Sequence, residues 1–226
     1  MPPRRTPASR RDRPAKPPLS RAGVVAVALR ILREEGLEKV TMRRLAGELD
    51  TGPSSLYVYL QNMAEVHGAV LDALLADLPM PDPATTKDPR GALTDLLTAY
   101  TGLLFGYPSL ARSVLALWPS GPNYLRLIDT TIALLDALGV PPRQASWGFD
   151  VLLQYATATA AEQATRDESD DSDREWDGLT EAIGRAPGRE YPAIARHRDD
   201  LFSGTPEQKL RWTLTALING VAGTPA

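Results

Sequence analysis

Residues that could carry catalytic or metal chemistry are scarce in this chain. Its 226 residues contain no cysteine and only two histidines, His67 and His197, which lie far apart in the sequence. These counts exclude disulfides, zinc ribbons, iron–sulfur centres and thiol nucleophiles, and they argue against a histidine-rich metal site. No nucleophile–base motif, phosphate-cradling glycine loop or metal-ligand spacing is present. The sequence therefore predicts a protein without enzyme activity, metal or cofactor.

The side chains best suited to a chemical role are those that bind nucleic acid, and they are concentrated in residues 41–60. Two short helices are predicted there, at about 42–49 and 53–61. A tight turn, Asp50-Thr51-Gly52, joins them, and the pair forms a helix-turn-helix. In this motif the second helix enters the major groove of DNA.

The apolar pattern of the second helix decides which side chains face DNA. Leu56 and Leu60 lie one helical turn apart and are predicted to be buried, which leaves the other positions on the opposite or flanking faces. Serine, tyrosine and arginine side chains can bond phosphates or base edges, and valine can contact a thymine methyl group. The predicted DNA-facing residues are Arg43, Arg44, Ser54, Ser55, Val58 and Tyr59.

The charge distribution also favours DNA binding at one end. Residues 1–62 carry a net charge of +6 and the remaining residues carry −9, within a total of −3. A basic end on an acidic body is expected when only that end meets a polyanion. Residues 1–18, rich in proline and arginine, are predicted to be a disordered basic arm. The arm either contacts phosphates or the minor groove, or is only a solvating tail.

Helical periodicity extends along most of the chain, and no strand pattern interrupts it. A first helix is predicted between the N-cap residue Ser20 and Gly36, and a fourth at about 64–78. After a proline-rich break at 79–89, helices are predicted at 90–106, 108–118, 122–138, 141–166, 176–185, 190–202 and 206–221. The acidic stretch 166–177 lacks the glycine of a calcium loop and is predicted to be a solvated loop. The predicted fold class is all-α.

Residues 19–78 resemble the DNA-binding domain of the TetR family of bacterial regulators. The most specific segments are REEGLEKVTMRRLAGEL and SSLYVYL, the latter followed by Gln61-Asn62. DPRGALTDLL, GYPSLARSVLAL and LLDALGVPP are more loosely similar to the C-terminal core of the tetracycline-repressor subclass. The resemblance implies a helix-turn-helix domain at 19–63 and a helical ligand-binding and dimerisation domain at 64–226. The helix at 64–78 is then the connector.

The resemblance also implies a function, a homodimeric repressor that leaves a palindromic operator when a small molecule binds in its core. Thr41 and Arg43 are implied to contact DNA. The implied recognition surface is Pro53, Ser54, Ser55, Tyr57, Val58 and Tyr59. Two positions depart from the family pattern. Asp50 replaces a glycine but tolerates left-handed geometry, and Met63 replaces a common lysine, which removes one phosphate contact.

The core segments combine large apolar side chains with scattered polar groups. Most such residues only pack the core, but a subset can line an apolar pocket with a few orienting polar groups. The candidate ligand-binding residues are Trp118, Tyr124, Trp147, Gln154 and Tyr155. The expected effector is a small apolar molecule. A metal-bound tetracycline is not expected, because the core helices contain no histidine to help hold it.

Two segments are the candidates for a homodimer interface, 141–166 and 206–221. The first has small residues that permit close helix approach, and the second has a series of large apolar residues. No apolar run approaches the length of a membrane span and no targeting signal is recognisable, so a cytoplasmic location is expected. The arginine- and alanine-rich composition is typical of bacteria with GC-rich genomes. The alternative left open is a helical small-molecule carrier or enzyme that keeps the helix-turn-helix as a scaffold.

Overall fold

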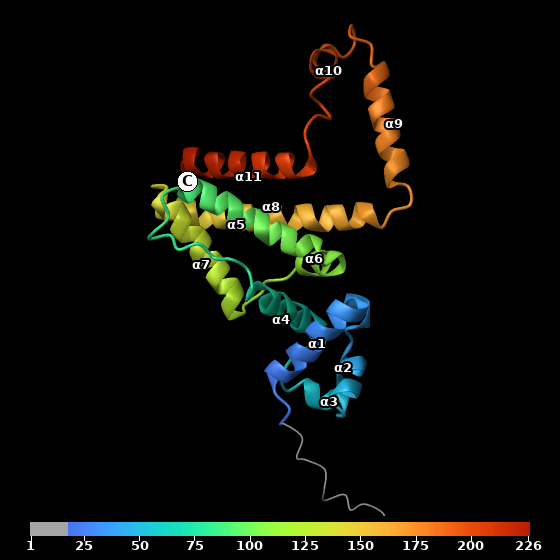
Figure 1. Cartoon of the computed structure of the whole chain (residues 1–226), viewed down its shortest axis with the longest axis vertical. Coiled ribbons are helices and arrows are strands. Elements are labelled where there is room, and N and C mark those ends of the chain that lie inside the picture. The colour runs from blue at the N-terminus through green and yellow to red at the C-terminus, as the bar shows by residue number, and fades with distance from the viewer. Residues whose placement is uncertain (1–17) are drawn as a thin grey trace, which may run out of the picture.

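The computed structural model describes residues 18–226, which form an all-helical protein (Figure 1). The elements are α1 (Arg21–Glu35), η2 (Leu37–Lys39), α2 (Met42–Glu48), α3 (Pro53–Leu56), α4 (Met63–Leu75), α5 (Pro89–Phe105), α6 (Pro108–Val114), α7 (Pro122–Ala137), α8 (Pro142–Asp167), α9 (Ser172–Arg185), α10 (Pro192–His197) and α11 (Pro206–Gly223). No strand occurs in this part of the chain, and the predicted all-α fold class is confirmed. Most of the predicted basic arm lies outside the described residues.

Helices α1, α2 and α3 form a small head at one end of the molecule (Figure 1). The hydroxyl of Ser20 accepts a hydrogen bond from the Gly23 amide at 3.1 Å and begins α1, as expected of an N-cap. Leu45, Leu56 and Leu60 have no exposed surface and form the centre of the head. Two of these three, Leu56 and Leu60, are the leucines that the helical pattern predicted to be buried, and that prediction is confirmed.

The turn between α2 and α3 confirms the expectation for Asp50. This residue has a φ of 49°, in the left-handed region that glycine usually fills. Aspartate adopts this conformation more readily than most residues because its short side chain can bond the local backbone. The substitution of aspartate for glycine therefore leaves the turn of the helix-turn-helix intact.

The core is built around α8, which packs against α5, α6, α7 and α11. Gly148 on α8 lies so close to α11 that a Cβ there would overlap the Val221 side chain. Seven helices, from α3 to α11, begin with a proline, which fits the first turn of a helix because its missing N–H has no partner there. Helix α4 packs on α1 in the head and on α6 and α7 in the core.

Several predicted helix limits were wrong. The helix predicted at 53–61 ends at Leu56 and continues as turns, and the one predicted at 108–118 ends at Val114. The connector predicted at 64–78 spans Met63–Leu75, and the helix predicted at 190–202 is shortened to α10. After α3, α4 and α6 the apolar period continues beyond the last helical turn, because Leu60, Leu78 and Leu117 still pack against the core. No residue of α10 is buried, so the core does not account for the limits of that helix.

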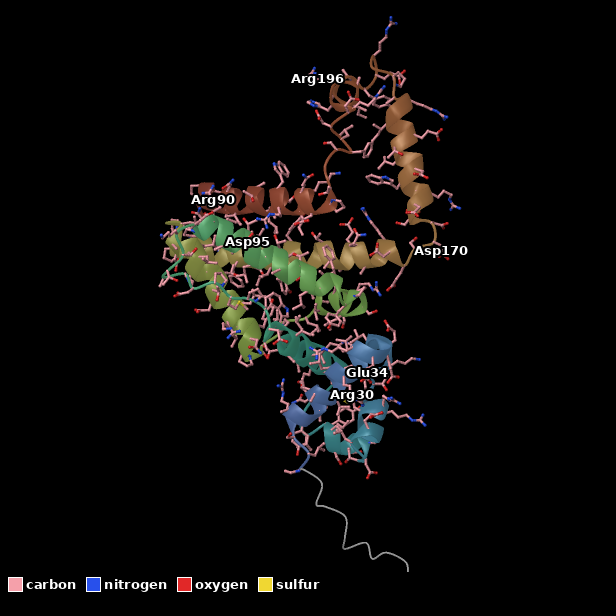
Figure 2. The ribbon with its side chains drawn as sticks, in the orientation of Figure 1. Arg30, Glu34, Arg90, Asp95, Asp170 and Arg196 are labelled. Atoms are coloured by element: carbon pink, nitrogen blue, oxygen red, sulfur yellow. The ribbon has the colours of Figure 1, made fainter. Side chains whose placement is uncertain are left out.

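The prediction of a solvated loop at 166–177 was also wrong. Helix α8 extends to Asp167 and α9 begins at Ser172, so only a short turn containing Asp170 separates them (Figure 2). Asp173 and Glu175 lie in the first turn of α9, where acidic side chains interact favourably with the helix dipole. The acidic residues therefore begin a helix rather than prevent one.

Helices α9 and α10 project away from the layer that contains α5, α8 and α11 (Figure 1). No residue of either helix is buried. The ring of Trp176 meets that of Phe202 edge-on, with centroids 5.1 Å apart, and holds the two sides of this projection together. The projection thus leaves Trp176 and other apolar side chains partly exposed, among them Leu179 and Tyr191.

Candidate DNA-binding surface and core cavity

The outer face of the helix-turn-helix carries the side chains that the sequence predicted to face DNA. Val58 is 80% exposed and Tyr57 is 50% exposed, although both are large and largely apolar. Pro53, Ser54 and Ser55 are exposed on α3, and Tyr59 is half-buried. The turn after α3 presents Tyr57 and Val58 because Leu56 and Leu60, on either side of them, point into the head. An exposed valine beside hydroxyl groups suits the thymine methyls and polar edges of a major groove.

Arg43 and Arg44 are adjacent on α2 but have different surroundings. Arg44 Nη2 lies 2.8 Å from Glu35 Oε1 and 3.0 Å from Glu48 Oε1. Arg43 is exposed and forms no ion pair with any residue from 18 to 226. The Thr41 hydroxyl caps α2 by accepting from the Arg44 amide at 3.1 Å. Arg43 can therefore reach DNA without breaking a bond within the protein, whereas Arg44 cannot.

The carboxylates that hold Arg44 belong to a small network across the head. Arg30 on α1 pairs with Glu34 at 2.8 Å and with Glu48 on α2 at 2.6 Å (Figure 2). Exposed pairs of this kind contribute little to stability, because water and salt screen them. Because Glu48 bonds arginines from α1 and from α2, the network fixes the orientation of α2 against α1.

The two arginines give a matched test of the DNA-binding surface. We expect Arg43→Ala to weaken operator binding about tenfold, the cost of one base or phosphate contact of about 1–3 kcal/mol. Arg44→Ala should weaken it less than about threefold, because its guanidinium is held by Glu35 and Glu48. Fluorescence anisotropy with labelled operator at fixed salt measures both. A larger loss for Arg44→Ala would contradict this assignment.

A cavity of about 280 Å³ lies in the core between the end of α6, the loop after it, α7 and α8. Its wall is mostly aromatic and aliphatic, with a carboxylate, an amide and two hydroxyl groups. The lining residues are Val114, Leu115, Ala116, Leu117, Trp118, Pro119, Tyr124, Ile128, Phe149, Asp150, Leu153, Gln154 and Thr157. This apolar wall with a few polar groups has the composition of a small-molecule site.

The structure brings three of the five predicted ligand residues to this cavity, namely Trp118, Tyr124 and Gln154. Tyr155 lines a different cavity, of about 400 Å³, between α5, α8 and α11. Trp147 lines neither of these two cavities. It is 56% exposed, and the Arg143 guanidinium lies 4.7 Å from its ring centre. The five residues therefore do not form one site.

Sequence reasoning missed several lining residues on α8, among them Phe149, Asp150, Leu153 and Thr157. Together with Gln154 they recur at helical spacing, so they share one face of α8. That periodicity was visible in the sequence. However, α8 has buried residues around much of its circumference, and the period alone does not distinguish a cavity-lining face from a packed one.

Thr157 illustrates how the cavity wall is held. Its hydroxyl donates to the Leu153 carbonyl at 2.9 Å, so it accepts the hydrogen bond from the Tyr100 hydroxyl, also at 2.9 Å. Burial raises the pKa of Tyr100 well above its usual range. Tyr100 therefore stays protonated and keeps its donor role. Thr157 can offer the cavity only an acceptor.

A buried carboxylate on α4 connects the head to the helix that lines the cavity. Asp72 Oδ1 accepts hydrogen bonds from the backbone amides of Asn123 at 2.8 Å and Tyr124 at 2.9 Å. The Asn123 side-chain amide donates to the Asp72 carbonyl at 3.0 Å. A Cβ at Gly121 would overlap the Asp72 carboxyl group, so glycine is needed there. Asp72 thus caps the first turn of α7 from another helix.

Two further polar contacts join the head and connector to α6. His67 Nδ1 on α4 lies 2.5 Å from the Ser113 hydroxyl, and burial lowers the pKa of His67. The Ser109 hydroxyl donates to Glu38 of η2, and this bond lowers the pKa of Glu38. Helix α6 is therefore attached to η2 and to α4.

The loop that follows α6 separates two cavities. Leu117, Trp118 and Pro119 line the cavity against α8, and they also line a second one of about 410 Å³ against α4. Trp118 is 89% exposed. A molecule that moves this loop would act on the surface of α4 as well as on the cavity.

No helix among residues 18–226 is both long enough and apolar enough to cross a lipid bilayer. The same part of the chain gathers no three side chains of histidine, cysteine, aspartate or glutamate that could hold a metal ion.

Comparisons with known proteins agree with this arrangement. A candidate transcription regulator of known structure from Streptomyces coelicolor is 50% identical, with a TM-score of 0.75, and the match covers 93% of this chain and 98% of that one. The TetR family protein ActR from the same organism, solved in complex with actinorhodin, is 29% identical, with a TM-score of 0.78, and the match covers 92% and 99%. The tetracycline repressor protein class C of Escherichia coli is 25% identical over 204 residues, 90% of each chain.

The family model of the tetracyclin repressor-like C-terminal domain matches residues 82–224, more than half of the chain. The relatives are bacterial regulators, so the interpretation as a regulator is confirmed over the alternative of an enzyme or a carrier. The chain therefore belongs to the TetR family of DNA-binding transcriptional repressors that respond to small molecules, and its C-terminal domain is of the tetracycline-repressor type.

Proposed function

We propose that this protein is a homodimeric repressor that binds a palindromic operator and leaves it when a small molecule occupies the cavity between α6, α7 and α8. Residues 19–63 bind DNA and residues 64–226 bind the ligand and form the dimer. The observation that carries the proposal is the bond between Asp72 of α4 and the first turn of α7. It joins the helix that supports the head to the helix that carries Tyr124 of the cavity.

In the DNA-bound state, Val58, Tyr57, Ser54 and Ser55 face the major groove, and Arg43 contacts a phosphate or a guanine edge. Thr41 and Arg44 lie at the edge of this surface, with Arg44 held by carboxylates of the head. Pro53 and Tyr59 are the remaining residues of the DNA-binding surface. The exposed valine and tyrosine support this role, because large apolar side chains at a surface mark an interaction site.

Release follows from linkage between the two sites. A ligand weakens DNA binding only if it prefers a conformation whose two heads no longer match the half-sites. A ligand between Trp118, Tyr124 and Gln154 presses on the loop after α6 and on the first turn of α7. The loop shares the wall of the second cavity with α4, and the first turn of α7 is hydrogen-bonded to Asp72 of α4. Helix α4 then changes the separation of the heads.

The dimer forms through α8 and α11. Trp212 on α11 is 73% exposed, and Trp147 and Val151 on α8 are exposed as well. Exposed apolar side chains of this size on two long neighbouring helices support a buried interface between two copies of the chain. A two-fold axis in the protein then matches the two-fold axis of the operator, with half-sites about 34–36 Å apart. The protein acts in the cytoplasm, where the operator is.

We expect Trp212→Glu to convert the dimer into a monomer, because a carboxylate would be buried there without a partner. Sedimentation velocity measures the change, with Leu125→Glu as the control, since Leu125 is 55% exposed on α7. A Trp212→Glu protein that remains dimeric would place the interface elsewhere.

The experiment that tests the proposed function is selection of binding sites from random duplex DNA. The wild-type protein should enrich an inverted repeat, and the same selection with Arg43→Ala should enrich it more weakly. Binding to the selected site should weaken steeply with salt, since phosphate contacts release counterions. If no sequence is enriched, even after refolding has removed any co-purified ligand, the proposal fails.

A further inference from the structure

The cavity between α6, α7 and α8 has one charged group in an aromatic wall. Of its described lining residues, only Asp150 carries a charge, and Trp118, Tyr124 and Phe149 supply three aromatic rings. Asp150 forms no ion pair with any residue in the described part of the chain. Its negative charge is therefore available to whatever enters the cavity.

The other polar groups of the cavity favour a ligand that donates hydrogen bonds. The Thr157 proton is committed to the Leu153 carbonyl, so Thr157 presents only an acceptor. Burial, and then the nearby Asp150 carboxylate, raises the pKa of Tyr124. The phenol therefore stays neutral at ordinary pH, and the negative charge of the site resides on Asp150. Gln154 is neutral and can serve either as donor or as acceptor.

We propose that the effector is a small aromatic cation, a protonated amine joined to an apolar ring, with Asp150 as its counter-ion. The inference rests on the proposed function, because it takes this cavity as the effector site. A carboxylate attracts a cation, and the faces of tryptophan and tyrosine rings attract it further. An anionic ligand of the same shape meets an unpaired carboxylate and is repelled.

The charge of the whole core acts in the same direction. Residues 63–226 carry a net charge of −9, and a negative field raises the local concentration of cations at a cleft. No lysine or arginine lines the cavity among the described residues, so nothing in its wall offsets Asp150. Apolar lining residues such as Ile128 and Leu153 bind the uncharged ring.

Three probes with one ring system test the proposal, namely 1-naphthylmethylammonium, 1-naphthylmethanol and 1-naphthaleneacetate. Isothermal titration calorimetry of the wild-type protein should show the cation binding at least about tenfold more tightly than the carboxylate, with the alcohol between them. Asp150→Asn should reduce this preference to less than about threefold. Asp129→Asn is the matched control, because Asp129 is exposed on α7 and does not line the cavity, and it should keep the preference.

Equal or tighter binding of the carboxylate, an unchanged preference in Asp150→Asn, or binding of none of the three probes at millimolar concentration would overturn the proposal. Operator binding by the same protein samples is measured separately. If the charge preference is missing while a selected operator is still bound, the proposed effector chemistry is wrong and the DNA-binding function stands. If operator binding also fails, the proposed function itself is wrong.

Discussion

The Val58→Glu protein is expected to bind its operator at least about 100-fold more weakly than the wild-type protein, about 3 kcal/mol. Val58 is 80% exposed on the face that we propose meets the major groove. The substitution removes an apolar contact to a base and places a carboxylate among phosphates, where repulsion adds to the loss. Fluorescence anisotropy with the selected operator measures the change.

The folded state should be unaffected by this substitution. Replacement of an exposed side chain usually changes the free energy of unfolding by no more than about 0.5 kcal/mol, and urea unfolding tests this. Leu125→Glu adds the same charge at an exposed position of α7 and should leave operator affinity within about twofold of the wild type. If Val58→Glu binds normally, the surface around α3 does not face DNA.

Removal of the Asp72 carboxylate is expected to affect both stability and regulation. Asp72→Ala leaves the amides of Asn123 and Tyr124 without their acceptor in a mostly buried position. Each buried unsatisfied group costs about 1–3 kcal/mol, so the free energy of unfolding should fall by about 2–4 kcal/mol. Asp72→Asn keeps an oxygen acceptor and should lose about half as much.

We also expect Asp72→Asn to reduce the release of the operator by a ligand. For a ligand that weakens operator binding of the wild-type protein by tenfold or more, the effect on Asp72→Asn should be less than about threefold. Ligand affinity should change little, because Asp72 does not line the cavity between α6, α7 and α8. A variant that is released from the operator as efficiently as the wild type would show that coupling takes another route, such as the contact between His67 and Ser113.

The head was predictable from the sequence because its determinants are local. The caps Ser20 and Thr41, the buried Leu56 and Leu60, and the turn at Asp50 are each readable within a few residues of chain. What local patterns missed was the early end of α3 at Leu56. There, Tyr57 to Tyr59 form a turn, although the apolar period still places Leu60 in the core.

The cavity and the contacts that join its walls to α4 were not predictable, because they depend on segments that are distant in the sequence. Asp72 meets Asn123 across 51 positions, and His67 meets Ser113 across 46. Nothing in the surroundings of Asp72 in the sequence distinguishes it from a surface aspartate. Likewise, Trp147 is a tryptophan like Trp118, and Tyr155 is a tyrosine like Tyr124. Only the packing of α8 determines that Trp118 and Tyr124 line this cavity and that Trp147 and Tyr155 do not.

We expect ligand binding in the core and operator binding in the head to be coupled. The direct measurement takes a small molecule that stabilises the wild-type protein in a thermal-shift assay and titrates the selected operator with and without it. We expect the ligand to raise the operator dissociation constant at least about fivefold, and the operator to weaken ligand binding by the same factor, as linkage requires. A ligand that binds in the cavity and leaves operator affinity unchanged would contradict this expectation.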